Sequence, residues 1–207
     1  MLAENLGIDW EKISIQPVVD GIENQMKELF AGLPADVTEE NIQARVRGVF
    51  LMALSNKLDY ILLNTSNKSE ASVGYATLYG DMNGGLSVLG DVYKTDVYSI
   101  SKFINSKKEI IPYNIIYKEP SAELRPDQKD SDSLPDYEIL DKLLYRFIEM
   151  KETKREIIKA GFDEKMVDRI ISLVNRTEYK RFQTPPILRV SSKAFGIGRR
   201  IPLVAKY

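Results

Sequence analysis

The chain has 207 residues, of which 43% are apolar and 29% charged, a composition typical of a folded domain with a substantial core. Its 29 basic and 30 acidic side chains give a net charge of −1, so we expect no binding to nucleic acid or to an anionic membrane. Cysteine and histidine are absent, which excludes disulfides, thiolate metal sites and histidine bases. No segment has the roughly 20 apolar residues that span a bilayer, and no signal pattern opens the chain, so we expect a cytoplasmic protein.

The first part of the chain is expected to alternate between helix and strand. The N-terminal residues are typical of the last turn of a helix, which Gly7 would close. The alternating, β-branched stretch KISIQPVV predicts a strand that ends near Pro17. A helix is predicted over residues 22–31 and another from Thr38, where two acidic residues follow a capping side chain. Apolar residues recur at helical spacing along this second helix: Ile42, Val46, Val49, Phe50 and Leu54.

The middle of the chain predicts the carboxyl edge of a parallel sheet. YILLNT (residues 60–65) is typical of a short buried strand, residues 96–105 of a helix, and YNIIYK (residues 113–118) of an edge strand. Such alternation favours an α/β fold with a parallel sheet and helices on both faces. Ligands bind beyond the carboxyl ends of the strands in such sheets, and Asn64 and Thr65 follow such an end.

The chain after residue 117 has a different composition. Residues 118–138 hold three prolines, many charges and few apolar residues, and a loop of this length is usually functional or mobile. Two amphipathic helices are predicted after it, over residues 137–159 and 164–179. There is no internal repeat or evident boundary, so we expect one domain over residues 1–207.

The polar cluster TSNKSE (residues 65–70) allows two interpretations. Lys68 and the hydroxyls suit phosphate or ribose oxygens, and Glu70 suits Mg²⁺, which accepts one or two carboxylates plus substrate phosphates. The same residues could instead begin a capped helix, with Ser66 or Asn67 as the cap. The nearby GDMNGG is compatible with an ordinary turn.

Three stretches share a resemblance to one family. NIQARVRGVFLMALSNKLDYILLNTSNKSEASVGYATLYGDMNGGLSVLGDVYKTDVYSISKFIN, KEPSAELRPDQKDSDSLPDYEILD and EYKRFQTPPILRVSSKAFGIGRRIP closely resemble the synthetase domain of glutamine-dependent NAD synthetases. The resemblance implies a Rossmann-like parallel sheet of the adenine-nucleotide α-hydrolase type, usually in a homodimer. It also implies that ATP, with Mg²⁺, adenylylates the carboxylate of deamido-NAD, and that ammonia from a glutaminase domain displaces AMP. Neither step requires histidine or cysteine.

The resemblance implies roles for eight residues. Those implied for ATP are Thr65, Lys94 and Ser121. Those implied for deamido-NAD are Asn41, Arg45, Glu70, Asp81 and Lys180, and Glu70 is also the implied Mg²⁺ ligand. The alternatives are polar positions on an exposed helix face for Asn41 and Arg45, and a solvated lysine at a helix start for Lys94.

One departure from the family is large. The family's domain begins with a strand and a phosphate loop of the form Ser-Gly-Gly-x-Asp-Ser, and this chain has no Ser-Gly-Gly. We therefore expect an incomplete synthetase domain, truncated at its N-terminus, that forms no NAD by itself. The alternative is a non-catalytic module that binds a nucleotide or dimerises.

Overall fold

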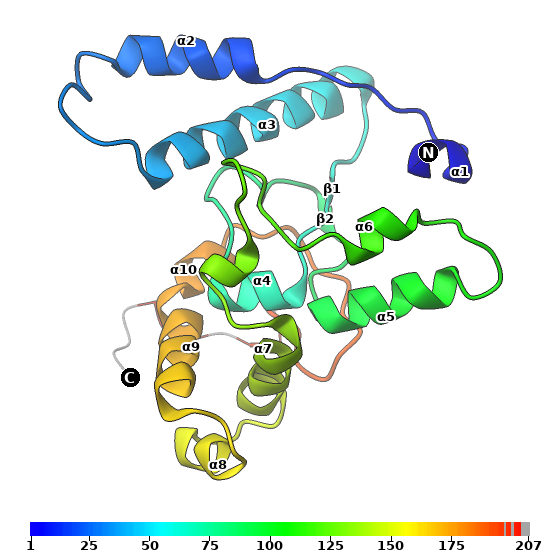
Figure 1. Cartoon of the computed structure of the whole chain (residues 1–207), viewed down its shortest axis with the longest axis vertical. Coiled ribbons are helices and arrows are strands. Elements are labelled where there is room, and N and C mark those ends of the chain that lie inside the picture. The colour runs from blue at the N-terminus through cyan, green and yellow to red at the C-terminus, as the bar shows by residue number, and fades with distance from the viewer. Residues whose placement is uncertain (197, 200, 204–207) are drawn as a thin grey trace.

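Helices dominate the computed structural model, which describes residues 1–196, 198–199 and 201–203 (Figure 1). The helices are α1 (Leu2–Leu6), α2 (Gln16–Met26), α3 (Val37–Leu58), α4 (Lys68–Val73), α5 (Lys94–Ile104), α6 (Tyr113–Tyr117), α7 (Tyr137–Leu144), α8 (Lys154–Lys159), α9 (Glu164–Arg176) and α10 (Glu178–Arg181). A 3₁₀ turn spans Asp130–Asp132, and a π-helical turn at Tyr145–Glu149 extends α7. None of the described helices is long and apolar enough to cross a membrane.

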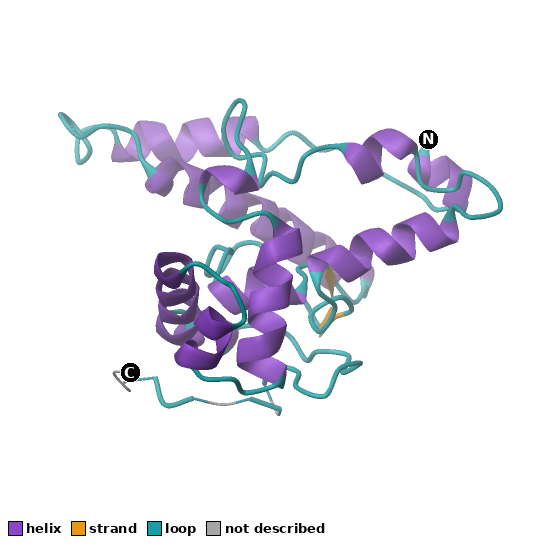
Figure 2. Cartoon of the chain, turned by 60° about the horizontal axis from the view of Figure 1, so that its bottom comes forward, coloured by secondary structure: helices purple, strands orange, loops and turns teal. Residues whose placement is uncertain are grey.

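A small parallel sheet lies among the helices (Figure 2). Strand β1 (Leu63–Asn64) pairs in parallel with β2 (Leu86–Ser87), with Leu63 opposite Leu86 and Asn64 opposite Ser87. Ser87 also forms a parallel bridge with Ile187. The predicted α/β class with a parallel sheet is therefore confirmed.

The buried apolar side chains form two clusters. The larger one joins α4, α7, α8 and α9, and its centre is Leu140, Leu143, Leu144, Ile157, Val167, Ile170 and Val174, each fully buried. The smaller one lies between α2 and α3, where Val19 packs near Ile42 and Val46. Figure 1 shows the α2–α3 pair at the opposite end of the molecule from α8 and α9.

Several predicted helix ends are confirmed. Gly7 follows α1 in the left-handed region (φ 63°), which favours glycine. Helix α3 begins at Val37, one residue before the predicted Thr38, but its capping residue is Asp36 and not Thr38, because the Asp36 carboxylate and Glu39 form the capping box. Helix α5 covers most of the predicted residues 96–105.

Two strand predictions are wrong. The stretch KISIQPVV has no strand; instead α2 starts at Gln16 with Pro17 in its first turn, where proline's fixed φ suits a helix. Helix α2 also ends at Met26, earlier than predicted. YNIIYK forms α6, which follows Pro112, and only Ile116 of its apolar residues is buried.

The YILLNT run is a strand for only two residues. Ile61 is 75% exposed and Leu63 52% exposed, so the predicted burial of this strand is wrong. Its one described neighbour in the sheet is β2, which leaves the rest of the run without strand pairing. On α3, likewise, Ile42 and Val46 are buried, whereas Val49 is 64% exposed.

Candidate functional site

The site is built around the turn between β1 and α4. Asn64 ends β1, and its side-chain amide donates to the carbonyls of Asp81 at 2.7 Å and Asn83 at 3.0 Å, so the GDMNGG turn is fixed against the strand end. Helix α4 then begins with a capping box: Asn67 Oδ1 accepts the Glu70 N–H at 3.0 Å, and Glu70 accepts the Asn67 N–H at 3.3 Å. The capped-helix interpretation is thus confirmed.

A cavity of about 540 Å³ opens beside this turn. It contains seven of the eight site residues implied by the family resemblance: Asn41, Thr65, Glu70, Asp81, Lys94, Ser121 and Lys180. The eighth, Arg45, does not line it; its Nε donates to the carbonyl of Leu78 at 3.1 Å and so supports the turn that carries Asp81. The capped start of α4 therefore also forms part of the wall of the cavity, because Glu70 belongs to both.

In the lining of the cavity, Glu70 and Lys94 form an ion pair, with Lys94 Nζ 3.3 Å from Glu70 Oε1. Burial raises the pKa of Glu70, and the positive charge of Lys94 opposes that shift. Lys94 Nζ also lies 5.5 Å above the Tyr137 ring, within the range of a cation–π interaction. Lys94 is therefore held at the site rather than solvated.

Three other lining residues, Asn41, Thr77 and Asp81, form a chain of hydrogen bonds. Thr77 Oγ1 donates to Asn41 Oδ1 at 2.8 Å, and the Thr77 N–H donates to Asp81 Oδ1 at 2.7 Å. Lys180 Nζ donates to two backbone carbonyls after α4, at 2.7 Å each. Burial raises the pKa of Asp81 and lowers that of Lys180, while the charge of each opposes the shift of the other.

The loop between α6 and α7 closes the cavity over α3. Its backbone accepts hydrogen bonds from two α3 side chains, Gln43 to Leu124 O at 3.0 Å and Arg47 to Glu123 O at 3.1 Å. Ser121 and Asp130 face the cavity from this loop. The length of this loop in the sequence indicates that it contributes to the site. No sequence motif, however, identifies Asp130, Tyr75 or Thr77, which also line the cavity.

The charged lining suits a phosphate-bearing ligand with a divalent cation. Four carboxylates and three cationic groups line the cavity: Glu40, Glu70, Asp81, Asp130, Lys94, Arg125 and Lys180. The described residues contain no group of three or more His, Cys, Asp or Glu that could hold a metal by itself. Mg²⁺ needs only one or two carboxylates when substrate phosphates complete its shell, so Glu70 fits such an ion.

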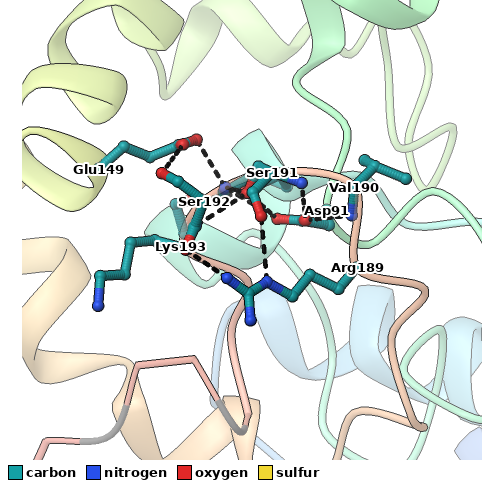
Figure 3. A network of polar contacts seen from close by, with 9 residues as sticks. Asp91, Glu149, Arg189, Val190, Ser191, Ser192 and Lys193 are labelled. Atoms are coloured by element: carbon teal, nitrogen blue, oxygen red, sulfur yellow. Dashed lines mark hydrogen bonds and ion pairs between the residues drawn. The ribbon is translucent and has the colours of Figure 1, made fainter.

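Lys68 has a role that the sequence did not reveal. Its side chain is fully buried, with Nζ 2.9 Å from Asp91, 2.8 Å from Glu149 and 2.7 Å from Ser191 Oγ. Asp91 also accepts the N–H groups of Val190 and Ser191, at 2.8 and 2.6 Å (Figure 3). The phosphate-binding interpretation of Lys68 is therefore wrong, because this lysine joins α4 to the C-terminal segment outside the cavity.

Comparison with known proteins decides the family. The NAD synthase family model matches residues 1–184. The chain belongs to the NAD synthase family. It is 50% identical over 204 residues to the glutamine-dependent NAD(+) synthetase of Acinetobacter baylyi, covering 98% of this chain and 38% of that protein. It is 49% identical to the Thermotoga maritima enzyme of the same name, covering all of this chain and 36% of that protein. The chain thus spans less than two fifths of the length of these relatives.

Solved structures of the NAD synthase family and similar proteins agree with the fold. The glutamine-dependent NAD+ synthetase of Acinetobacter baumannii, solved with ADP, matches with a TM-score of 0.56 at 43% identity, over 98% of this chain and 36% of that one. NMN synthetase from Francisella tularensis matches with a TM-score of 0.71 at 28% identity, over 86% and 66%. A synthetase from Cytophaga hutchinsonii has a TM-score of 0.80 at 22% identity, over 99% and 35%, which shows the fold alone. The predicted fold type is confirmed.

Proposed function

We propose that this chain carries most of the ligand-binding site of a carbon–nitrogen ligase that amidates deamido-NAD to NAD at the expense of ATP. The observation that carries the proposal is the single cavity in which seven residues, from Asn41 to Lys180, meet. These residues come from α3, the β1–α4 turn, α4, the segment between α4 and β2, α5, the α6–α7 loop and α10. Their convergence is what a site for two large ligands requires.

The first half-reaction needs positive charge around phosphate. In the proposed reaction a carboxylate oxygen of deamido-NAD attacks the α-phosphorus of ATP, the P–O bond to the β-phosphate breaks, and pyrophosphate leaves with the electron pair. Lys94, Thr65 and Ser121 would bind the nucleotide, and Glu70 would hold Mg²⁺. When bound, Mg²⁺ would offset the negative charge that develops on the leaving group.

The second half-reaction needs the dinucleotide held in place. Asn41, Asp81 and Lys180 would contact deamido-NAD, and Arg45 would support the turn that carries Asp81. Ammonia then attacks the adenylylated carboxyl carbon, the C–O bond breaks, AMP departs with the electron pair, and a proton is released. We propose that the ammonia comes from a glutaminase domain, that the protein is cytoplasmic, and that it forms a homodimer.

Binding measurements test the proposal directly on the 207-residue chain. Isothermal titration with deamido-NAD and with ATP plus Mg²⁺ should show one saturable site for each ligand. Lys180→Met should weaken deamido-NAD binding by at least roughly tenfold, because a hydrogen-bonding charge is lost from a half-buried site. Lys159→Met, at the exposed end of α8, is the matched control. Failure of both ligands to bind the folded chain would overturn the proposal.

A further inference from the structure

The start of helix α5 is capped by side chains of two other helices. Its own capping residue, Tyr93, makes no side-chain capping hydrogen bond. The Lys94 N–H instead donates to the Ser69 hydroxyl of α4 at 2.9 Å, and the Thr95 N–H donates to the Asp141 carboxylate of α7 at 2.9 Å. A carboxylate is favoured there, because the N-terminus of a helix carries the positive end of its dipole. The backbone that carries Lys94 is therefore tied to both α4 and α7.

The Asp141 carboxylate joins these contacts into one network. Its Oδ1 accepts the Ser69 hydroxyl at 2.5 Å, and its Oδ2 accepts both the N–H and the hydroxyl of Thr95, at 2.9 Å each. Ser69 is fully buried, and Asp141 is only 5% exposed. Because the Ser69 hydroxyl accepts from Lys94 and donates to Asp141, a single oxygen links the starts of α4 and α5 to α7.

Each end of this network adjoins one member of the Glu70–Lys94 ion pair in the chain. Ser69 immediately precedes Glu70, and Thr95 immediately follows Lys94. The side chains of Glu70 and Lys94 line the cavity, whereas Ser69, Thr95 and Asp141 do not belong to its lining. Asp141 can therefore influence a ligand in the cavity only through the residues that it holds.

Helix α7 gives the Asp141 carboxylate a firm support. Leu140, Leu143 and Leu144, on the same helix, are fully buried in the larger apolar cluster. Groups that bind a ligand keep their geometry when the residues around them are fixed by packing and hydrogen bonds. Glutamate and lysine side chains have many rotamers, so the separation of Glu70 and Lys94 depends on where their backbones are held.

We propose that Asp141 is a positioning residue that fixes Glu70 and Lys94 relative to each other, so that one meets Mg²⁺ and the other meets the phosphates of ATP; this inference rests on the proposed function. Ser69 transmits the effect to Glu70 on α4, and Thr95 transmits it to Lys94 on α5.

The effect of Asp141 should be selective for one of the two ligands. The residues proposed for deamido-NAD have other supports: Asn41 accepts the Thr77 hydroxyl, and Lys180 donates to the backbone after α4. Loss of the Asp141 carboxylate should therefore weaken the binding of ATP with Mg²⁺ and spare the binding of deamido-NAD. A general loss of stability would not separate the two ligands in this way.

A pH titration of the Glu70 side-chain carboxyl signal, followed by NMR, tests the positioning without any ligand. Asp141→Asn removes the charge and replaces one acceptor oxygen with a donor. Lys94 opposes the rise that burial causes in the Glu70 pKa, so displacement of Lys94 should raise this pKa further. Removal of a negative charge would by itself lower the Glu70 pKa, so the direction separates the two effects. Asp96→Asn, an exposed residue in the first turn of α5, is the matched control and should not raise it.

Isothermal titration measures the consequence for the ligands. Asp141→Asn should weaken the binding of ATP with Mg²⁺ by roughly threefold to tenfold, the factor that one hydrogen bond contributes, and leave deamido-NAD binding unchanged. Thr95→Val removes one hydrogen bond from the network and no charge, so it should change both measurements in the same direction. Thr95→Ser keeps the hydroxyl and should behave as the unaltered chain does. Amide spectra establish that each variant is folded.

The results separate this role from the proposed function. A raised Glu70 pKa and a selective loss of ATP binding in Asp141→Asn and Thr95→Val, with neither change in Asp96→Asn, support the assignment. An unchanged Glu70 pKa, or equal losses for both ligands, would overturn it, and the two Thr95 variants decide if Asp141→Asn does not fold. If neither ligand binds the unaltered chain, the proposed function fails, and the Glu70 titration still decides whether Asp141 positions the pair.

Discussion

The carboxylate of Glu70 and the ammonium group of Lys94 lie 3.3 Å apart, although 24 residues separate them in the sequence. The family resemblance implies that Glu70 binds Mg²⁺ and that Lys94 binds ATP phosphates. In this structure, which holds neither ligand, the two side chains are paired with each other. Binding of ATP with Mg²⁺ would exchange this pair for one cation on Glu70 and phosphate oxygens on Lys94. Each of the two charged side chains would then still have a partner of opposite charge.

Glu70→Gln should reduce the effect of Mg²⁺ on ATP binding. Glutamine can keep the capping box of α4, because it still accepts the Asn67 N–H, but it loses the charge that Mg²⁺ requires. Loss of groups that merely support a metal ligand costs roughly tenfold or more in metal affinity, so we expect at least that loss for the ligand itself. Isothermal titration of ATP with and without Mg²⁺ measures it.

Glu156→Gln provides the matched control for this change. Glu156 occupies the same position of a capping box in α8, where it accepts the Thr153 N–H at 2.7 Å, and it lies outside the cavity. The control should bind ATP and Mg²⁺ as the unaltered chain does. An undiminished Mg²⁺ effect in Glu70→Gln would remove Glu70 as the metal ligand.

Lys68→Met should destabilise the chain by about 3–5 kcal/mol, since it leaves Asp91 and Glu149 without their buried cation. Urea denaturation gives this difference in the free energy of unfolding. Lys154→Met, which removes the exposed ion pairs to Glu164 and Asp168, should cost far less, because solvent-exposed ion pairs contribute little to stability. Equal costs for the two substitutions would contradict the importance of the buried network.

The buried carboxyl group of Asp141 should make the free energy of unfolding depend on pH. Its buried carboxylate accepts the N–H and hydroxyl of Thr95, both at 2.9 Å, yet burial raises its pKa, and the hydrogen bond from Ser69 opposes the shift. A raised pKa in the folded state means that the contribution is complete below the unfolded pKa and is lost as pH rises through the folded pKa. The advantage of the unaltered chain over Asp141→Asn should therefore shrink as the pH rises above about 4, the ordinary pKa of an aspartate. Urea denaturation across this range measures it, and a growing advantage would reverse the assigned direction.

Exposed apolar residues on α3 predict a homodimer. Val49, Leu51, Leu54 and Leu58 are all exposed on this helix. Light scattering at micromolar concentration should give twice the 23.6 kDa of one chain, and Leu54→Asp should return it to a monomer. Phe103→Asp, an exposed apolar residue on α5, is the control that should stay dimeric. A monomeric mass for the unaltered chain would count against the dimer.

Local signals in the sequence predict a cap for α4 at Ser66 or Asn67, and the structure shows Asn67 as the cap, paired with Glu70 in a capping box. They predict strands poorly here. YNIIYK is β-branched and aromatic, but as α6 it needs only Ile116 in the interior, so tertiary packing overrides β propensity. Pro17, taken as the end of a strand, instead belongs to the first turn of α2, a position that proline also favours.

The family resemblance pointed to residues that are far apart in the chain, and the structure brings seven of those eight residues together in one cavity. The burial of Asp130 and Lys68 could not be predicted from the sequence. An aspartate in a polar loop and a lysine in a polar cluster are ordinary exposed residues by type, and only the fold shows that both are buried. Burial of a charge depends on partners distant in sequence, which no local pattern contains.

The bond between Lys68 and Ser191 spans 123 residues, and Ser191 lies beyond residue 184, where the family match ends. During synthesis the α4 segment leaves the ribosome long before its partner does. Until the last part of the chain arrives, Lys68 has its two acidic neighbours but not the hydroxyl that completes its shell. Contacts of such long range slow folding, since the intervening chain must be ordered first. The buried network around Lys68 is therefore completed late, and a ribosome that stalls before residue 191 would leave Lys68 without the Ser191 hydroxyl.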